Sequence, residues 1–442
     1  MLSLLAHQGQ AQAPSWQWAA QSKGSGIGQL KGLAVDAKGN TYGVGFFTEK
    51  VQFGGATLIS QGRSDLFVAK LSSEGVWEWC VSAGAAGSDH ASGVVVDASG
   101  RVFVSGSFSN RVAFGALALS SQGDMDVFVA EISPKGDWLW ASAAGGTGAD
   151  RASALAVSSK GELVVGGQFT GTAAFGPLQV VSNGGGDAFV VRLTRAGTWQ
   201  WAVGAGSPDN DETSALAINA AGDIYATGYF SNSAHFGASV LTGQGTDDAF
   251  VAKLSPGGQW QWASAATSTN TAYGKGLTVD PAGGVYVTGA FWGNAQFGAI
   301  RLNSPSSDDG FVARVSDTGQ WVWVTVLSSD YLESIVGIAL DKGGKLCVAG
   351  TFSRTIRGGD FQLTSHGQRD VFVGYLNRQG AWLGLMAGGG VETDQMQAMA
   401  LAPGGDVVVG GDFRLAAAFG ATRLQSGTAE AQVCVGRASV PR

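Results

Sequence analysis

Short apolar stretches alternate with turn residues along the chain, and none shows the 3.6-residue spacing of an amphipathic helix. The segment KGLAVDAKGNTYGVGFF from Lys31 predicts two strands joined by a tight turn, because Asp36 can accept turn hydrogen bonds and Gly39 tolerates a positive φ. Further on, DLFVAKLSSEGVWEWCVSA predicts another hairpin. We therefore expect strands A to D at residues 32–36, 41–47, 66–72 and 77–82.

This pattern returns every 61 residues, in seven copies without insertion or deletion. The clearest marker is a tryptophan that opens each strand D: Trp16, Trp77, Trp138, Trp199, Trp260, Trp321 and Trp382. A glycine in strand B keeps the same spacing: Gly45, Gly106, Gly167, Gly228, Gly289, Gly350 and Gly411. Four short antiparallel strands in a unit of this length are typical of a β-propeller blade, so we predict an all-β, seven-bladed propeller.

The carboxyl end supplies strands A to C of a last blade, expected at 398–402, 406–413 and 431–437, and then lacks a strand D. The segment SWQWAAQ at residues 15–21 is the D-type segment without a blade. We expect it to pair beside the last strand C and to close the ring, which removes two exposed sheet edges. Trp16 and Trp18 are then structural residues.

The pattern GLAVDAKGNTYGVGFF followed by SDLFVAKLSSEGVWEW resembles the SBBP-type bacterial β-propeller repeat, which occurs in exported proteins. The resemblance covers residues 15–437 as a single propeller domain and leaves 438–442 as a tail. It implies architecture and not activity. The segment at residues 48–65, with VQFGGATLISQG, is an addition between strands B and C, and we expect it to form an extra hairpin.

Composition limits the possible partners. The chain has 442 residues, of which 45% are hydrophobic and 14% charged, so it can bury a large core. A net charge of −7 with scattered basic residues argues against nucleic acid binding. No apolar run approaches the roughly 18 residues of a membrane helix. We expect a monomer that does not insert into membranes.

The amino terminus, MLSLLAHQGQAQAPS, resembles the end of a secretory signal, although a basic region is missing and the apolar stretch is short. We interpret residues 1–14 as a disordered remnant of such a signal and expect an extracellular or cell-envelope protein. Cys80, Cys347 and Cys434 replace apolar residues of sister repeats, so they are predicted to be free and buried. The four histidines show no metal-ligand spacing.

Two acidic sets recur in the connections between strands B and C and between strands D and A, which emerge on one face of the ring. The first is Asp65, Asp126, Asp187, Asp248, Asp309 and Asp370, and the second is Asp89, Asp150, Asp211, Glu333 and Asp394. We expect this face to be acidic. The first set is interpreted as structural, because an aspartate before a strand can bond its own turn.

The alternative for the richest acidic loops is Ca²⁺ binding, by Asp209 and Asp211 in SPDNDE or by Asp124 and Asp126 in GDMD, since hard cations prefer clustered oxygens. Neither loop has a complete Ca²⁺-binding pattern. No other cofactor is expected.

Departures from the repeat are the better functional signal. Trp292, Tyr273 and Tyr331 stand where sister repeats carry other residues, all in connections on the acidic face. They form either a cluster that stacks on a sugar or anchors a protein, or three separately exposed rings.

Three classes of function remain open. The first is an exported, non-catalytic module that binds carbohydrate or protein on the acidic face, which we favour because no catalytic motif is present. The second is a polysaccharide hydrolase or lyase at the channel mouth, with candidates Asp209, Asp211, Glu212, Asp308 and Asp309. The third is an intracellular scaffold of the WD-repeat type. Fold class alone does not choose among them.

Overall fold

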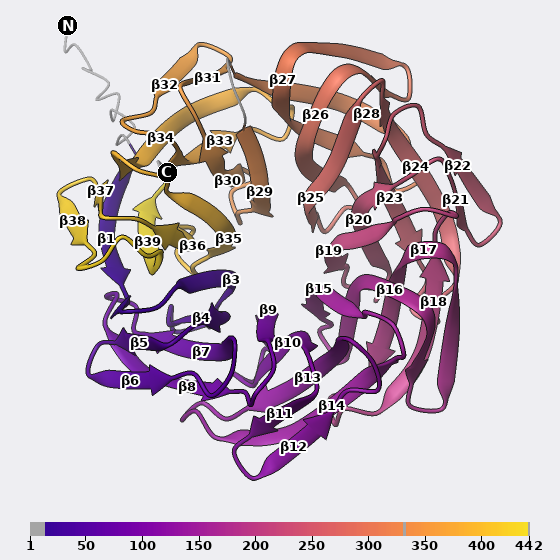
Figure 1. Cartoon of the computed structure of the whole chain (residues 1–442). Coiled ribbons are helices and arrows are strands. Elements are labelled where there is room, and N and C mark those ends of the chain that lie inside the picture. Colours follow the sequence, from indigo (N-terminus) through magenta and orange to yellow (C-terminus); the bar gives the residue numbers. More distant parts are fainter. Residues whose placement is uncertain (1–13, 330–332, 441–442) are drawn as a thin grey trace, which may run out of the picture.

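The computed structural model describes residues 14–329 and 333–440. These residues form antiparallel sheets arranged around a central opening, which is a β-propeller, with the first and last described strands side by side (Figure 1). The all-β prediction is confirmed. The described residues include no helix long and apolar enough to cross a membrane.

The innermost strand of each sheet corresponds to the expected strand A. These strands are β3 (Gly28–Val35), β9 (Asp89–Val96), β15 (Arg151–Val157), β19 (Glu212–Ile218), β25 (Thr271–Val279), β29 (Glu333–Leu340) and β35 (Gln395–Leu401). Each contacts the next in this order, and β35 contacts β3. We number the repeats 1 to 7 in the same order.

The second and third strands follow outward. The second are β4 (Thr41–Phe47), β10 (Val102–Phe108), β16 (Leu163–Phe175), β20 (Ile224–Phe230), β26 (Val285–Phe297), β30 (Leu346–Phe352) and β36 (Val407–Phe413). The third are β7 (Asp65–Leu71), β13 (Asp126–Ile132), β17 (Leu178–Leu193), β23 (Asp248–Leu254), β27 (Ile300–Val315), β33 (Asp370–Leu376) and β39 (Gln432–Ser439).

The outermost strands carry the paired tryptophans. They are β8 (Trp77–Ala83), β14 (Trp138–Gly146), β18 (Trp199–Ala205), β24 (Trp260–Ser268), β28 (Trp321–Ser329), β34 (Trp382–Gly390) and β1 (Ser15–Gln21). Strand β1 pairs antiparallel with β39, from Ser15 opposite Ser439 to Gln21 opposite Cys434. The first strand of the chain is thus the outer strand of the sheet that its end forms.

Several expected boundaries differ by one residue, and larger differences occur at the start of strand A and at the end of the last strand C. The last strand A was expected to begin at residue 398, but β35 begins at Gln395, because a bulge between Met396 and Ala398 lets its pairing with β36 continue. Strand A was expected to begin at residue 32, but β3 begins at Gly28, because a bulge between Leu30 and Gly32 lets pairing with β4 continue to Phe47. The last strand C was expected to end at 437, but β39 continues to Ser439, because Ala438 and Ser439 pair with β1.

The segment between strands B and C forms the expected extra hairpin. Separate hairpins are β5 (Lys50–Phe53) with β6 (Ala56–Ile59), β11 (Arg111–Phe114) with β12 (Leu117–Ser120), β21 (Ser233–Phe236) with β22 (Ser239–Thr242), β31 (Thr355–Gly358) with β32 (Phe361–Thr364), and β37 (Ala416–Phe419) with β38 (Thr422–Gln425). In repeats 3 and 5 the hairpin is continuous with β16 and β17 or with β26 and β27. The short β2 (Lys23–Gly24) pairs with β5.

These hairpins join neighbouring sheets. The end of β34 in repeat 6 pairs with β37 in repeat 7, and β28 in repeat 5 pairs with β31 in repeat 6. A phenylalanine at the end of the first hairpin strand meets the tryptophan of strand D edge to face, as in Phe53 with Trp77, whose ring centroids are 4.8 Å apart. The addition between strands B and C therefore contributes to the core.

The tryptophan pairs of the outer strands link adjacent repeats on both sides. The first indole N–H donates to a backbone carbonyl of the preceding outer strand, as Trp77 does to Gln21 at 3.0 Å. The second donates to the turn between strands C and D of the following repeat, as Trp79 does to Pro134 at 3.1 Å. The indoles of Trp138 and Trp323 lack such a bond, and Trp140 donates to Glu131 of its own sheet. These bonds therefore join neighbouring repeats at most of the interfaces and not at each one.

Trp16 and Trp18 make the same two links. Trp16 donates to the carbonyl of Ala387 in repeat 6 at 2.9 Å and meets Phe419 edge to face at 4.8 Å. Trp18 donates to the carbonyl of Ser73 in repeat 1 at 3.0 Å. Strand β1 thus contacts three repeats at once, and its loss exposes the core on both sides.

We expect Trp16→Ala to lower the free energy of unfolding by about 3 kcal/mol, the usual cost of truncating a packed tryptophan. Deletion of residues 15–21 is expected to abolish the single cooperative transition. The matched control is Trp292→Ala, whose ring is 42% exposed, with an expected change below about 1 kcal/mol. Urea unfolding followed by tryptophan fluorescence measures all three, and an unchanged transition in the deletion variant contradicts the role of β1.

Candidate functional site

The carboxylates of the predicted acidic face are buried and do not form an acidic surface. Asp65, Asp126 and Asp187 are each 1% exposed, and Asp248 and Asp370 are fully buried. Most accept the backbone N–H four residues earlier, as Asp126 does from Gln122 at 3.0 Å. These aspartates fold inward because the unpaired N–H groups of their own turns need an acceptor. The expectation of an acidic face is therefore wrong for these residues.

The Ca²⁺ hypothesis gains no geometric support. Within residues 14–329 and 333–440, no three His, Cys, Asp or Glu side chains come together as metal ligands. Asp209 accepts a hydrogen bond from Asn232, and Asp211 accepts the N–H of Ser207 at 2.7 Å. Asp124 is exposed, whereas Asp126 is buried. Ca²⁺ binding stays a prediction.

The three predicted aromatic residues have different environments. Tyr331 lies outside the described residues, and Trp292 is 42% exposed at the end of the B segment of β26. Tyr273 on β25 is partly buried: its hydroxyl donates to Asp247 at 2.7 Å, and its ring meets Tyr229 at 5.5 Å between centroids. The Lys275 ammonium lies 5.0 Å from the same ring centroid. Tyr273 is therefore held by its neighbours.

The position of Tyr273 points to the inner end of the repeats, which sequence reasoning did not identify as a site. Three repeat positions meet there on the first two strands of each sheet. They are Gln29, His90, Arg151, Glu212, Tyr273, Ser334 and Gln395; Lys31, Ser92, Ser153, Ser214, Lys275, Val336 and Gln397; and Phe46, Ser107, Gln168, Tyr229, Ala290, Thr351 and Asp412. We call this set the channel mouth.

A cavity of about 400 Å³ opens at the channel mouth. Its lining comes from inner strands β15, β19, β25, β29 and β35 and is mostly polar, with Glu212, Lys275, Ser334 and Gln395 among the lining residues. Arg369, from the connection before β33, also lines it. The volume suits a small polar group or the side chains of an inserted segment.

On the side of repeats 1 to 3, the mouth contains a neutral histidine between two cations. His90 stacks on Phe46 with ring centroids 4.1 Å apart, and its Nε2 lies 2.8 Å from the Ser64 hydroxyl. Burial, together with Lys31 and Arg151, lowers the pKa of the His90 imidazole to about 4. The ring is therefore uncharged at neutral pH and presents hydrogen-bonding nitrogens rather than charge.

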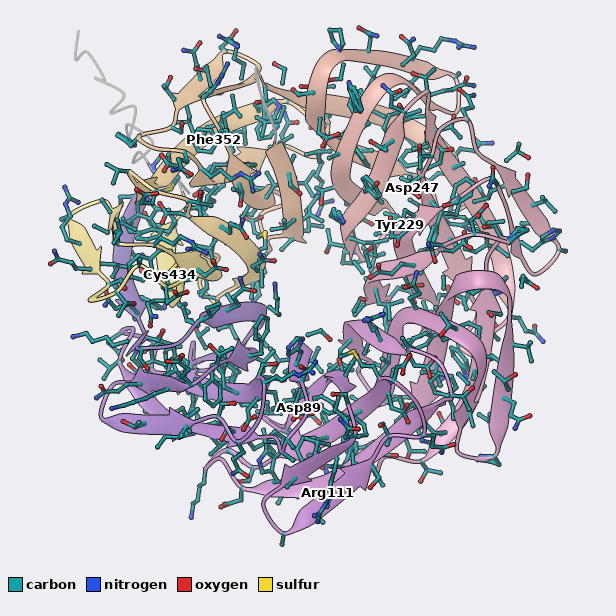
Figure 2. The ribbon with its side chains drawn as sticks, viewed as in Figure 1. Asp89, Arg111, Tyr229, Asp247, Phe352 and Cys434 are labelled. Atoms are coloured by element: carbon teal, nitrogen blue, oxygen red, sulfur yellow. The ribbon has the colours of Figure 1, made fainter. Side chains whose placement is uncertain are left out.

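On the side of repeats 3 to 5, acids and tyrosines approach one another. The Ser153 hydroxyl donates to Glu212 at 2.6 Å. Burial and the nearby Glu212 and Asp247 raise the pKa of the Tyr229 phenol to about 12. Tyr229 and Asp247 lie on the inner part of their sheet (Figure 2). These groups give the mouth both donors and acceptors.

The basic side chains of the mouth are available to a ligand. Lys31, Arg151, Lys275 and Arg369 form no ion pair within 4.0 Å with any residue that the structure describes. The arginines and lysines on the outer parts of the sheets behave differently, since Arg192 pairs with Glu162 and Lys253 with Asp223. Unpaired cations beside a cavity favour binding of an anionic or polar group.

Variation between repeats is the sequence signal that identifies this site. The first tryptophan of strand D and the glycine of strand B keep their identity in all repeats, because they perform the same packing in each. Two of the three channel-mouth positions differ in almost every repeat, although the backbone there is equivalent; the third has serine in repeats 2 to 4 and lysine in repeats 1 and 5. In the sequence, departures from the repeat had pointed only to Trp292, Tyr273 and Tyr331.

The cysteines agree in part with expectation. All three are free, with Cys347 and Cys434 buried and Cys80 partly buried. Burial raises the pKa of the Cys80 thiol to about 11.

No family model matches the chain. In an alignment of 171 residues that covers 34% of the chain, it is 25% identical to an uncharacterized WD repeat-containing protein, L264, of Acanthamoeba polyphaga mimivirus. Over 169 residues, or 36% of the chain, it is 31% identical to the regulatory protein FlaEY of Caulobacter vibrioides. The matches span 12% and 17% of these relatives' lengths.

Among solved structures, the WD40 domain of Neurospora crassa Pan2 aligns with a TM-score of 0.47 and 11% identity, covering 92% of this chain and 88% of that one. BamB from Moraxella catarrhalis aligns with a TM-score of 0.40 and 13% identity, covering 92% and 85%. Both scores are too low for a functional comparison.

We expect the His90 imidazole to stay neutral down to about pH 4, because it is buried beside Lys31 and Arg151. Arg151→Ala removes one of these cations and should raise the pKa of His90. Ring ¹⁵N chemical shifts measured between pH 4 and 8 test both statements. Lys342→Ala, in a turn at the opposite end of the sheets, is the control and should change nothing; a His90 that titrates near pH 6.5 in the unmodified protein contradicts the described environment.

Proposed function

We propose that the chain is a seven-bladed propeller, closed by β1 beside β39, that acts as a non-catalytic recognition module. Its ligand is a polar segment of a partner protein, bound at the channel mouth. The observation that carries the proposal is the diversity of the mouth positions in repeats that are otherwise nearly equivalent. Positions that only pack keep one residue type in every repeat, as the first tryptophan of strand D does, whereas the mouth positions are free of that constraint and can be fitted to a ligand.

A protein ligand fits the chemistry of the mouth better than a sugar. Sugar rings stack on open aromatic faces, but the Tyr273 ring is already packed beside Tyr229 and Lys275. The mouth instead offers unpaired cations, serine and glutamine side chains and Glu212 around a cavity of about 400 Å³. Such mixed donors and acceptors suit peptide groups and charged side chains.

Two of the five carboxylates considered for hydrolysis are poorly placed for catalysis. Asp211 is fully buried and bonded to Ser207 and Ser231, and Asp309 is 7% exposed and accepts the N–H of Ser329. A catalytic carboxyl has to reach the substrate. This favours binding over hydrolysis.

Export and the monomeric state stay predictions. The signal-like segment at residues 1–13 lies outside the described residues. An intracellular scaffold with the same binding mode is the alternative to an exported one.

Selection of peptides from a random displayed library on the intact protein tests the proposal. We expect the selected peptides to lose at least about tenfold in affinity on Arg369→Ala and on Lys275→Ala, since each removes an unpaired cation from the mouth. Lys342→Ala, in the turn between β29 and β30 on the opposite face, is the matched control and should bind normally. Peptides that are sensitive only to Lys342→Ala contradict the proposed site.

A glycan array with the same variants tests the ligand class. We expect no glycan binding that depends on the mouth residues. Glycan binding that is lost in Trp292→Ala replaces the protein ligand with a carbohydrate and moves the site to the exposed indole.

A further inference from the structure

Four repeats contain two buried aspartates that meet over a glycine. The first aspartate begins strand C or, in repeat 3, lies within the continuous strand β17. The second lies at or just before the start of the following strand A, and the glycine lies within one residue of the end of strand D. The sets are Asp65, Asp89 and Gly84; Asp126, Asp150 and Gly145; Asp187, Asp211 and Gly206; and Asp370, Asp394 and Gly389. We call each set a carboxyl pair.

The glycine occurs only where both aspartates occur. Repeat 4 has Asp248 with Ala272, and carries Thr267 at the glycine position. Repeat 5 has Asp309 with Glu333 and carries Ser328, and repeat 7 has neither aspartate and carries Lys23. The chain thus contains its own comparison between repeats with a pair and repeats without one.

Close packing explains the glycine. A Cβ on Gly145 would lie 2.6 Å from the Asp126 carboxyl carbon and 2.8 Å from Oδ2 of Asp150. A Cβ on Gly206 would lie 2.6 Å and 2.8 Å from the equivalent atoms of Asp187 and Asp211. Both carboxyl groups therefore rest against the same glycine, and any side chain there would displace them.

Hydrogen bonds distinguish repeats with and without a pair. With a pair, the second aspartate accepts the N–H of the residue after the glycine, as Asp150 accepts that of Gly146 at 2.7 Å. In repeat 4 the second aspartate is missing, and the equivalent N–H of Ser268 donates to the first aspartate, Asp248, at 2.6 Å. Repeat 5 behaves in the same way, with Ser329 donating to Asp309 at 3.0 Å.

The second aspartate thus takes over the donor of the first and leaves buried oxygens without a donor. Oδ1 has no donor in Asp126, Asp187 and Asp370, the first aspartates of three pairs. Oδ1 of the second aspartates Asp89 and Asp394 also lacks a hydrogen bond of ordinary length, although the backbone N–H groups of Ser109 and Arg414 face these two carboxyl groups. These aspartates are at most 1% exposed. Asp248 and Asp309, which have no aspartate partner, leave no such oxygen. Two adjacent buried carboxylates with an unused oxygen need a positive species between them.

We propose that this species is a proton, so that each carboxyl pair binds one proton shared between its two aspartates. Ca²⁺ prefers six to eight oxygen ligands at about 2.3–2.6 Å, whereas each pair offers two carboxylates that are already bonded to backbone N–H groups. The glycine packs directly on the carboxyl groups. A proton needs no further ligand and supplies the donor that the unpartnered oxygen lacks.

The acid strengths of the second aspartates agree with this assignment. Burial, followed by repulsion from the first aspartate, raises the pKa of Asp89, Asp211 and Asp394 to about 7 and that of Asp150 to about 6. Other charged or titratable groups face two of the pairs: Arg151 faces Asp150, His366 faces Asp370, and Asp412 and Cys434 face Asp394. Asp89 is faced by Asp65 and Asp211 by Asp187, so repeats 1 and 3 give the cleanest test.

The sign of the pH dependence follows. Near pH 6 the folded protein keeps protons that the unfolded chain releases above its ordinary aspartate pKa of 3.8. The proton bound by each pair therefore stabilises the folded state in full below the unfolded-chain pKa of 3.8. This stabilisation is lost as the pH rises through the folded-state pKa of about 7. Because each pair joins the two kinds of loop on the face of the channel mouth, the mouth is held most firmly in mild acid.

The first test is urea unfolding of the full chain between pH 5 and 8. The unfolding equilibrium constant should increase with pH, by up to about tenfold per pH unit for each pair. Asp211→Asn supplies a permanent donor in place of the proton. The number of protons that this variant releases on unfolding should therefore be smaller by at most about one. Asp36→Asn is the matched control and should keep the full dependence, because this carboxylate accepts the N–H groups of Lys38 and Asn40 and the Tyr42 hydroxyl, and it has no aspartate partner.

Infrared spectroscopy of the unmodified protein gives a readout that requires no variant. At pH 6 we expect a C=O band from protonated carboxyl groups, which disappears by about pH 8. The absence of this band, together with stability that does not change between pH 5 and 8, overturns the proposal. Resistance to urea that increases with Ca²⁺ at pH 8, and no longer does so in Asp211→Asn, overturns it in favour of a metal site.

Repeat 4 permits the converse experiment. The double substitution Thr267→Gly with Ala272→Asp recreates the sequence of a carboxyl pair beside Asp248. On folding, the double variant is expected to bind at most about one proton more than Thr267→Gly alone. Equal pH dependence of the two variants contradicts the idea that the pair itself binds the proton.

Discussion

The structure depends on the pairing of the first strand of the chain with the last. Every sheet of a propeller needs a neighbour on both sides, because its core lies between sheets. Strand β1 meets this requirement through its backbone bonds to β39 and through Trp16 and Trp18, which reach repeats 6 and 1. The hydrophobic cluster that includes Trp18, Leu30 and Val435 joins residues from the two ends of the chain. This contact joins the last sheet to its two neighbours.

The side chains on the inner and outer parts of the sheets have different roles. The outer parts repeat the same tryptophan, phenylalanine and glycine contacts, and they tolerate little change because each residue packs against two repeats. The inner ends of the strands border a space that packing does not fill, so their side chains differ without cost to the fold. This division is why the channel mouth is varied and polar while the outer ring is uniform.

The buried aspartates belong to the structural part although they look functional in the sequence. Their carboxyl groups satisfy turn N–H groups that water cannot reach, which is a common use of aspartate before a strand. Where two of these aspartates meet, their carboxyl groups need a positive species between them. The glycine that packs against both carboxyl groups is the sequence feature that marks such a contact. A structural role and a chemical property thus reside in the same residues.

The sequence by itself determined the all-β class, the repeat length, the hairpins and the turns at residues such as Asp36 and Gly39, because these depend on local spacing and backbone preference. It also marked SWQWAAQ as a strand without a local partner. Only the tertiary structure decided that the recurrent aspartates are buried, that Tyr273 is covered by Lys275 and Tyr229, and that Lys31, Arg151 and Arg369 lie at one mouth. These contacts join residues of different repeats. The direction in which such a side chain points is set by the packing of neighbouring sheets, which residue spacing along the chain does not specify.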